Sequence, residues 1–189
     1  ANLKYETLSD LHAYSARVAS AVGVMMCVLM NVRDKDVLAR ACDLGAAMQL
    51  TNIARDIGED ARNGRLYIPL RWMAEEGLDI NRFLNNPEPG KRVGRIAKRL
   101  LAEAERLYSR AEAGLSELPF SCRPGIFAAR HIYEQIGKHI AAADYDSITK
   151  RAFTTKMEKL SFLLLSVANS ATVSLMPRSA IVHAEPLEE

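Results

Sequence analysis

The stretch QLTNIARDIGED, residues 49–60, contains four oxygen-bearing side chains at intervals of three and four residues. They are two amides and two carboxylates: Gln49, Asn52, Asp56 and Asp60. A helix turns about 100° per residue, so these side chains fall within a stripe about 80° wide. The positions next to the stripe are apolar: Ala46, Leu50, Ile53 and Ile57. Glu59 and Arg62 fall on the far side, toward water. The pattern predicts a helix that is buried on one side, with its aspartates at the edge of the core.

Two carboxylates one turn apart destabilise a helix by a few tenths of a kcal/mol, and an apolar neighbourhood adds a desolvation cost. A divalent cation would remove both penalties. Mg²⁺ prefers oxygen ligands and usually takes one or two carboxylates together with substrate phosphates. The stripe therefore predicts a metal site at Asn52, Asp56 and Asp60, with Gln49 hydrogen-bonded to a phosphate or a water. The alternative is an ordinary solvated acidic face.

The rest of the chain is predicted to be all-helical, because apolar residues recur at three- and four-residue steps and strand-like alternation is scarce. Asn-Gly, Pro and Gly residues mark loops at 62–69 and 85–91. We expect one all-α domain over residues 1–176 and a disordered tail over 177–189. The expected helices cover about 7–31, 34–60, 69–76, 92–117, 124–144 and 155–176.

The composition excludes several classes of protein. A net charge of +2 with interspersed signs gives no nucleic-acid footprint. Three widely spaced cysteines fit neither a disulfide framework nor a metal-ligand spacing, and they indicate a reduced, cytoplasmic compartment. No signal peptide is visible. The apolar run at 22–30 is too short to cross a bilayer, and 160–176 is interpreted as a buried or interfacial helix.

Three segments resemble one family. QLTNIARDIGEDARNGRLYIP (49–69) resembles the second aspartate-rich motif of the squalene/phytoene synthase family, and most closely its bacterial phytoene synthase members. YSARVASAVG (14–23) resembles the tyrosine-bearing helix of that family, with Ser15 and Ser20 in place of the usual Cys and Gly. ARHIYEQIG (129–137) is a weaker match, in which Tyr133 occupies a family tyrosine position.

The resemblance implies an isoprenoid-synthase-type helical bundle with a deep apolar cavity. It implies the head-to-head condensation of two geranylgeranyl diphosphates to phytoene through a cyclopropyl diphosphate, with Mg²⁺, or Mn²⁺, assisting diphosphate departure. NADPH is not expected, because phytoene-type synthases stop before reduction. Two alternatives stay open: squalene or dehydrosqualene formation from farnesyl diphosphate, and a non-catalytic helical assembly domain.

The resemblance also assigns roles to single residues. The metal ligands would be Asn52, Asp56 and Asp60. The catalytic residues would be Asp56, Asp60 and Tyr14, the tyrosine associated with the carbocation steps. The substrate-binding residues would be Gln49, Asn52, Arg55, Arg65, Tyr67 and Tyr133. The helical wheel places Arg55 off the stripe, so its role requires a bend or a long reach, and the alternative is an ordinary solvent-facing arginine. For Tyr14 and Tyr133 the alternative is a core tyrosine.

One family feature is missing. The family has a first aspartate-rich motif upstream of the tyrosine helix, and the chain contains no second D-x-x-x-D. Glu6 and Asp10 have the same spacing but directly precede Tyr14. The chain therefore resembles the C-terminal portion of the family, an incomplete bundle with half a metal site. We expect it to be inactive without a partner, the missing N-terminal segment of the same protein.

Two apolar stretches have alternative interpretations. ITKRAFTTKMEKLSFLLL (148–165) places lysines and Arg151 beside a strongly apolar run. Such a segment can lie on an anionic surface, which predicts peripheral contact with the inner membrane, or it can be an ordinary amphipathic helix. The run VGVMMCVLM (22–30) can form a wall of the cavity, a part of the core, or both.

Overall fold

The structure is a computed structural model that describes residues 4–172, and most of these residues are helical. The helices are α1 (Leu8–Ser15), η1 (Ala16–Ser20), α2 (Ala21–Leu29), α3 (Lys35–Arg62), α4 (Leu70–Glu75), α5 (Ile80–Asn85), α6 (Lys91–Leu115), α7 (Arg123–Ala142) and α8 (Lys156–Thr172). No strand occurs within these residues, so the all-α prediction is confirmed. The predicted tail, 177–189, and the end of the last predicted helix lie outside the described residues.

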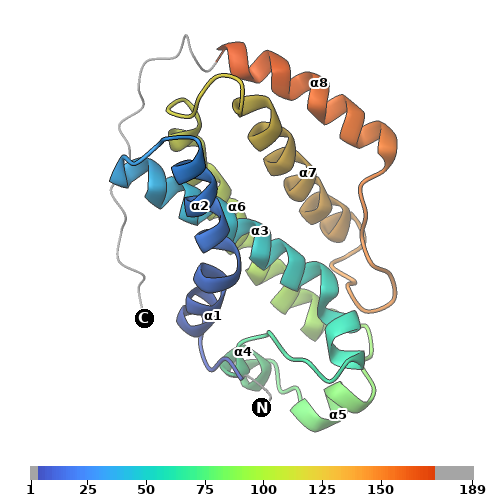
Figure 1. The fold of residues 1–189 in the computed structure, drawn as a ribbon. Coiled ribbons are helices and arrows are strands. Elements are labelled where there is room, and N and C mark those ends of the chain that lie inside the picture. Colours follow the sequence, from blue (N-terminus) through green and yellow to red (C-terminus); the bar gives the residue numbers. More distant parts are fainter. Residues whose placement is uncertain (1–3, 173–189) are drawn as a thin grey trace.

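The central element is α3, which spans 28 residues and lies along α6 (Figure 1). As predicted, Asp34 caps its start: Asp34 Oδ1 accepts hydrogen bonds from the backbone N–H groups of Asp36 and Val37 at 2.9 and 3.2 Å. Its apolar face forms the middle of the core. The positions predicted to be buried are buried: Ala46, Leu50, Ile53 and Ile57. Glu59 and Arg62 are exposed, also as predicted.

The first predicted helix is one continuous run, but it contains a wide π-type turn over Ala16–Ser20 that the sequence pattern did not predict. Thr7 caps its start through a capping box with Asp10. The run crosses α3 where Gly45 faces Ser20: a Cβ built on Gly45 would lie 2.7 Å from the Ser20 Cα. Small residues on both sides therefore permit a very close approach of the two helices.

Because α1, η1 and α2 are continuous, the apolar run 22–30 belongs to a longer helical stretch. By length and composition alone, the 22 residues Leu8–Leu29 would suffice to cross a membrane. This differs from the expectation that the apolar run 22–30 is too short to do so. One side of the stretch packs on α3. The other side exposes large apolar side chains: Val18, Val22, Met25, Met26, Val28 and Leu29.

The sequence pattern did not predict α5, which lies between the predicted elements at 69–76 and 92–117. Asp79 caps it by accepting a hydrogen bond from the Arg82 backbone N–H at 2.7 Å, and Phe83 anchors it in the core. Six residues are too few to display a helical period, and α4, which is equally short, was predicted from the breaks at Pro69 and Gly77 instead.

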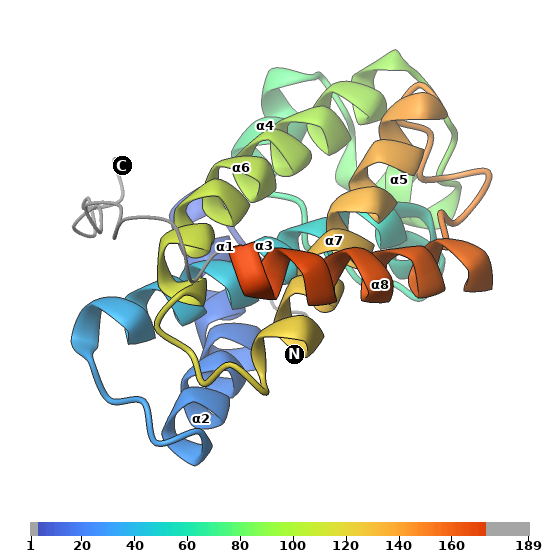
Figure 2. The ribbon, with the colours of Figure 1, turned by 90° about the horizontal axis from the view of Figure 1, so that it is seen from above.

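The last two helices form a pair at the outside of the bundle, with α8 running along α7 (Figures 1 and 2). Ser166 and Ser170 are buried in α8. Exposed apolar side chains lie elsewhere on α8: Met157, Leu160, Leu163, Leu164, Leu165 and Val167. The segment predicted to be buried or interfacial is thus buried along one side only.

Candidate functional site

The four polar side chains predicted to share one face of α3 are all partly buried. Gln49 and Asn52 line a cavity of about 320 Å³. Asp56 and Asp60 follow on the next two turns, so the stripe extends about 16 Å along the helix from Gln49. Neither aspartate is splayed into bulk water, because the Asp56 side chain is only 17% exposed and Asp60 is also partly covered.

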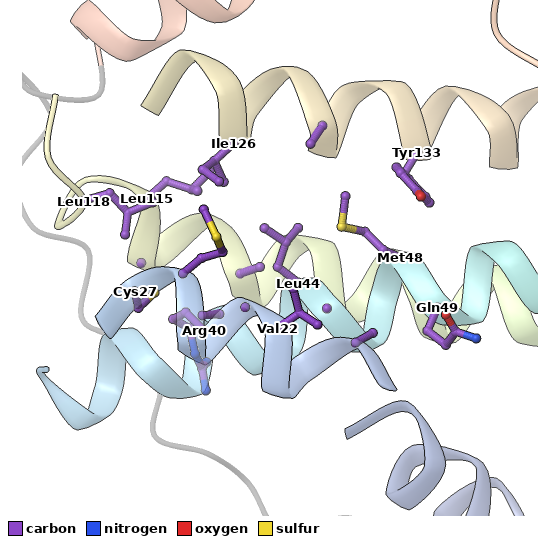
Figure 3. A pocket seen from close by; sticks show the side chains of 18 of the residues that line it. Val22, Cys27, Arg40, Leu44, Met48, Gln49, Leu115, Leu118, Ile126 and Tyr133 are labelled. Carbon is purple, nitrogen blue, oxygen red and sulfur yellow. The ribbon is translucent and has the colours of Figure 1, made fainter. Parts of the chain in front are cut away.

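The cavity lies between α7 on one side and α2 and α3 on the other (Figure 3). Ile126 and Tyr133 point from α7 toward Leu44 and Met48 of α3. Its lining is predominantly apolar and includes Val22, Met26 and Cys27 from the run 22–30. That run therefore contributes to a cavity wall, as predicted. The volume of the cavity falls in the range of small-molecule sites, about 300–1,000 Å³.

Asp56 is held by two guanidinium groups from different parts of the chain. Arg55 donates from Nε and Nη2 to the two carboxylate oxygens at 2.8 and 2.6 Å. Arg151, 95 residues away in sequence, donates from Nε to Oδ1 at 2.7 Å and from Nη2 to Oδ2 at 3.2 Å. Burial alone would raise the pKa of Asp56, but these hydrogen bonds lower it below its ordinary value.

Arg55 thus reaches the stripe by folding back onto its neighbour, which is the long reach that its position on the helical wheel requires. Arg151 was not among the predicted site residues, because its neighbours in sequence indicate only a basic segment. No local signal identifies it, since its contact with Asp56 depends on the path of the segment between α7 and α8.

Asp60 has the opposite electrostatic environment. Burial and the negative charge of Asp56 raise its pKa to about 6, against a partly compensating effect of Arg65. Arg65 is exposed and follows the end of α3, where its backbone N–H donates to the Asp60 carbonyl at 2.8 Å. The end of the stripe therefore holds a carboxylate whose negative charge is not fully neutralised by the protein.

This arrangement predicts that Asp60 destabilises the fold at neutral pH. Its folded-state pKa exceeds the ordinary 3.8, so the folded chain binds a proton more tightly than the unfolded chain, and stability falls as pH rises from about 4 through about 6. We expect Asp60→Asn to raise the free energy of unfolding at pH 7 by about 1 kcal/mol, a value discounted for partial exposure, and to change it little at pH 4. Urea unfolding at both pH values measures this difference.

Glu105→Gln, at an exposed position of α6, is the control for that measurement. It removes the same charge away from the site and should shift stability equally little at both pH values. An Asp60→Asn variant that is less stable than the parent at pH 7 would contradict the assignment of an unneutralised carboxylate.

Three tyrosine rings gather beside the carboxylate end of the stripe. The ring centroids of Tyr14 lie 5.2 Å from Tyr5 and 5.3 Å from Tyr67, and Tyr5 and Tyr67 are 6.0 Å apart. Burial, a hydrogen bond with Tyr67 and the nearby charge of Asp60 raise the pKa of Tyr14 to about 12. Tyr14 therefore remains protonated at physiological pH. The structure thus brings Tyr14 and Tyr67 together, while Tyr133 lines the cavity.

The candidate metal ligands come from a single helix. Within residues 4–172, no group of three or more His, Cys, Asp or Glu side chains could hold a metal ion. Asn52, Asp56 and Asp60 offer an amide oxygen and two carboxylates on consecutive turns. This donor set fits Mg²⁺ that takes its remaining ligands from water and phosphate, because Mg²⁺ rarely occupies a cage made only of protein groups.

The chain is similar in sequence to known proteins of one family. A family model described as squalene/phytoene synthase matches residues 1–158. The chain is 58% identical over 185 residues to a phytoene synthase from Rhodobacter capsulatus, covering 98% of this chain and 55% of the relative. It is 42% identical over 187 residues to a 15-cis-phytoene synthase from Enterobacter agglomerans, covering 97% and 63%.

Among solved structures, the fold is similar to the crystal structure of a dehydrosqualene synthase in complex with ligand. The TM-score is 0.78 at 28% identity, over 90% of this chain and 60% of that one. The chain therefore spans about half to two thirds of the length of these proteins, and it matches the C-terminal part of its relatives.

Proposed function

Because the chain belongs to the squalene/phytoene synthase family, we propose that it supplies the second aspartate-rich half of a phytoene synthase site. The reaction would be the head-to-head condensation of two geranylgeranyl diphosphates to phytoene through a cyclopropyl diphosphate. One observation supports this above all: a single face of α3 leads from an apolar cavity, at Gln49 and Asn52, to two carboxylates, Asp56 and Asp60. An isoprenoid diphosphate is divided in the same way, into a charged diphosphate and a long apolar chain.

The family generally uses divalent metal ions. In this chain we assign Mg²⁺, or Mn²⁺, to Asn52, Asp56 and Asp60, with no role for NADPH. When bound, the metal would neutralise the diphosphate and make it a better leaving group. The surroundings of Asp60 support the assignment, because burial and the charge of Asp56 raise its pKa and Arg65 compensates for this only in part.

The remaining predicted residues would act on the substrate. Arg55 and Arg65 lie at the carboxylate end of the stripe, where guanidinium groups can bind phosphate oxygens. Gln49 and Tyr133 line the cavity and would contact the substrate there. Tyr14 and Tyr67 would face the reacting carbons, since aromatic rings stabilise positive charge in a place from which water is excluded.

The alternative within the family is squalene or dehydrosqualene formation from farnesyl diphosphate, and the similarity to a dehydrosqualene synthase structure favours it. We prefer phytoene formation because the identity to proteins named phytoene synthase is about twice as high, 58% against 28%. A non-catalytic assembly domain is less favoured, because it would have no use for a cavity joined to acidic residues.

We further propose that a second aspartate-rich segment completes the site and packs against the exposed apolar side of α2, which includes Met25 and Leu29. The chain alone would then be inactive. Peripheral contact with the inner surface of the cytoplasmic membrane is supported by the exposed apolar side chains of α8, next to Lys156 and Lys159.

A fusion protein tests this function. The N-terminal part of the Rhodobacter capsulatus relative, joined ahead of this chain, should supply the second aspartate-rich segment. We expect the fusion, but not the chain alone, to convert labelled geranylgeranyl diphosphate to phytoene in the presence of Mg²⁺. A product from farnesyl diphosphate only would instead support the alternative, and a folded fusion that is inactive on both would contradict the proposal.

A further inference from the structure

The segment 143–155, which joins α7 to α8, lies directly on the last turns of α3. Ser147 and Ile148 are buried there. The Gly58 backbone N–H donates to the Ser147 carbonyl at 3.1 Å, and Arg62 Nη1 donates to the Ile148 carbonyl at 3.2 Å. A Cβ built on Gly58 would lie 2.7 Å from the Ile148 Cα, so only glycine permits this approach. The backbone before Arg151 is therefore fixed against the helix that contains the aspartates.

Beyond this anchor, Arg151 binds the Asp56 carboxylate. Its guanidinium contacts both carboxylate oxygens, and its Nε also lies 3.2 Å from Glu59 Oε2. Arg55 contacts the same two oxygens. Each oxygen of Asp56 thus accepts two charged hydrogen bonds, which leaves the carboxylate little capacity for a further cation.

A divalent cation cannot join this arrangement unchanged, because two guanidinium groups would then lie next to two added positive charges. One arginine must move, and the two differ in how free they are. The Arg55 side chain is 15% exposed, whereas that of Arg151 is 39% exposed. Arg151 also has a second partner at hand: its guanidinium carbon lies 5.4 Å from the centre of the exposed Phe153 ring.

We propose that Arg151 is an exchangeable counter-cation, which neutralises Asp56 while no metal is bound and transfers to the diphosphate when a divalent cation takes the carboxylate. The inference rests on the proposed function, since it requires that a metal and a diphosphate meet at Asp56. A guanidinium suits both tasks because its planar fork matches carboxylate and phosphate oxygens alike. Arg151 would be a substrate-positioning residue delivered by the fixed segment 143–150.

The test compares Arg151→Gln with Lys150→Gln, which removes the same charge from the preceding, exposed position. Mn²⁺ binding to the chain is titrated by electron paramagnetic resonance without phosphate. Removing a competing, partly exposed ion pair should tighten Mn²⁺ binding by about fivefold in Arg151→Gln. It should leave Lys150→Gln close to the parent.

A second measurement uses inorganic pyrophosphate. In saturating Mn²⁺, pyrophosphate should raise the Tm of the parent and of Lys150→Gln, while Arg151→Gln should lose at least about half of that rise. Arg151→Lys keeps the positive charge but loses the planar pair of donors, so it should recover only part of the rise in Tm. Circular dichroism confirms that all variants are folded.

The outcomes distinguish a failure of the Arg151 exchange from a failure of the proposed metal site. Tighter metal binding together with a weaker pyrophosphate effect supports the exchange. Equal Mn²⁺ affinity in the parent and Arg151→Gln overturns it while leaving the metal site standing. An unchanged pyrophosphate effect in Arg151→Gln overturns the transfer to diphosphate. No Mn²⁺ binding in any variant, either without or with pyrophosphate, would overturn the metal site at Asp56, and with it both the proposed function and this inference.

Discussion

Asp56→Asn should abolish product formation in the fusion protein, with a loss of at least about a hundredfold. The physical reason is that asparagine retains the size of the side chain but offers one neutral oxygen in place of two that share a negative charge. Even the loss of an outer partner of a metal ligand costs 10- to 100-fold in metal affinity or activity, and Asp56 is proposed as a direct ligand. Formation of labelled phytoene, followed at several Mg²⁺ concentrations, measures the loss.

The same substitution should have only a modest effect on folding. Asp56 forms ion pairs with Arg55 and Arg151 near the surface, and such pairs contribute roughly 1 kcal/mol or less to stability. Activity and stability should therefore separate in this variant, which distinguishes a ligand from a structural residue.

Asp43→Asn is a closely matched control. Asp43 lies on the same helix, and its carboxylate also contacts two arginines, Arg40 at 3.1 Å and Arg110 at 3.3 Å. It lies outside the stripe, so Asp43→Asn should leave a working site, whatever its effect on the stability of the chain. Equal activity losses in the two variants would show that Asp56 acts only through the fold, and an active Asp56→Asn would contradict its role as a ligand.

The stripe from Gln49 to Asp60 was predictable because a helical face is set by the spacing of residues in sequence, and the apolar residues beside the stripe fix which side is buried. The family resemblance then linked Tyr14 and Tyr67, which lie on separate elements and come together in the structure. Contacts between residues far apart in the sequence could not be predicted in this way. Arg151 reaches Asp56 only because the segment 143–155 crosses α3 at Gly58, and no periodicity records that crossing.

Gly45→Val should cause a large loss of stability. The Cβ that valine adds would lie 2.7 Å from the Ser20 Cα and 2.8 Å from the Ala19 carbonyl, distances that real Cβ atoms essentially never show. These are backbone atoms, so no side-chain rotation relieves the clash, and the run Leu8–Leu29 must move away from α3. We expect a loss of about 3 kcal/mol, at the upper end for overpacking, out of a total stability of about 5–15 kcal/mol. The urea midpoint measures it.

Because Ala19 and Gly45 both line the cavity, the displacement should also disturb the wall next to Gln49. Ser20→Gly should not rescue the variant, since the clash involves the Ser20 Cα and not its hydroxyl. Gly125→Val is the control, because a Cβ at Gly125, near the start of α7, meets no described atom within 4 Å. It should change stability by less than about 0.5 kcal/mol. If the two valine variants unfold at the same urea concentration, the close contact between η1 and α3 does not hold that cavity wall in place.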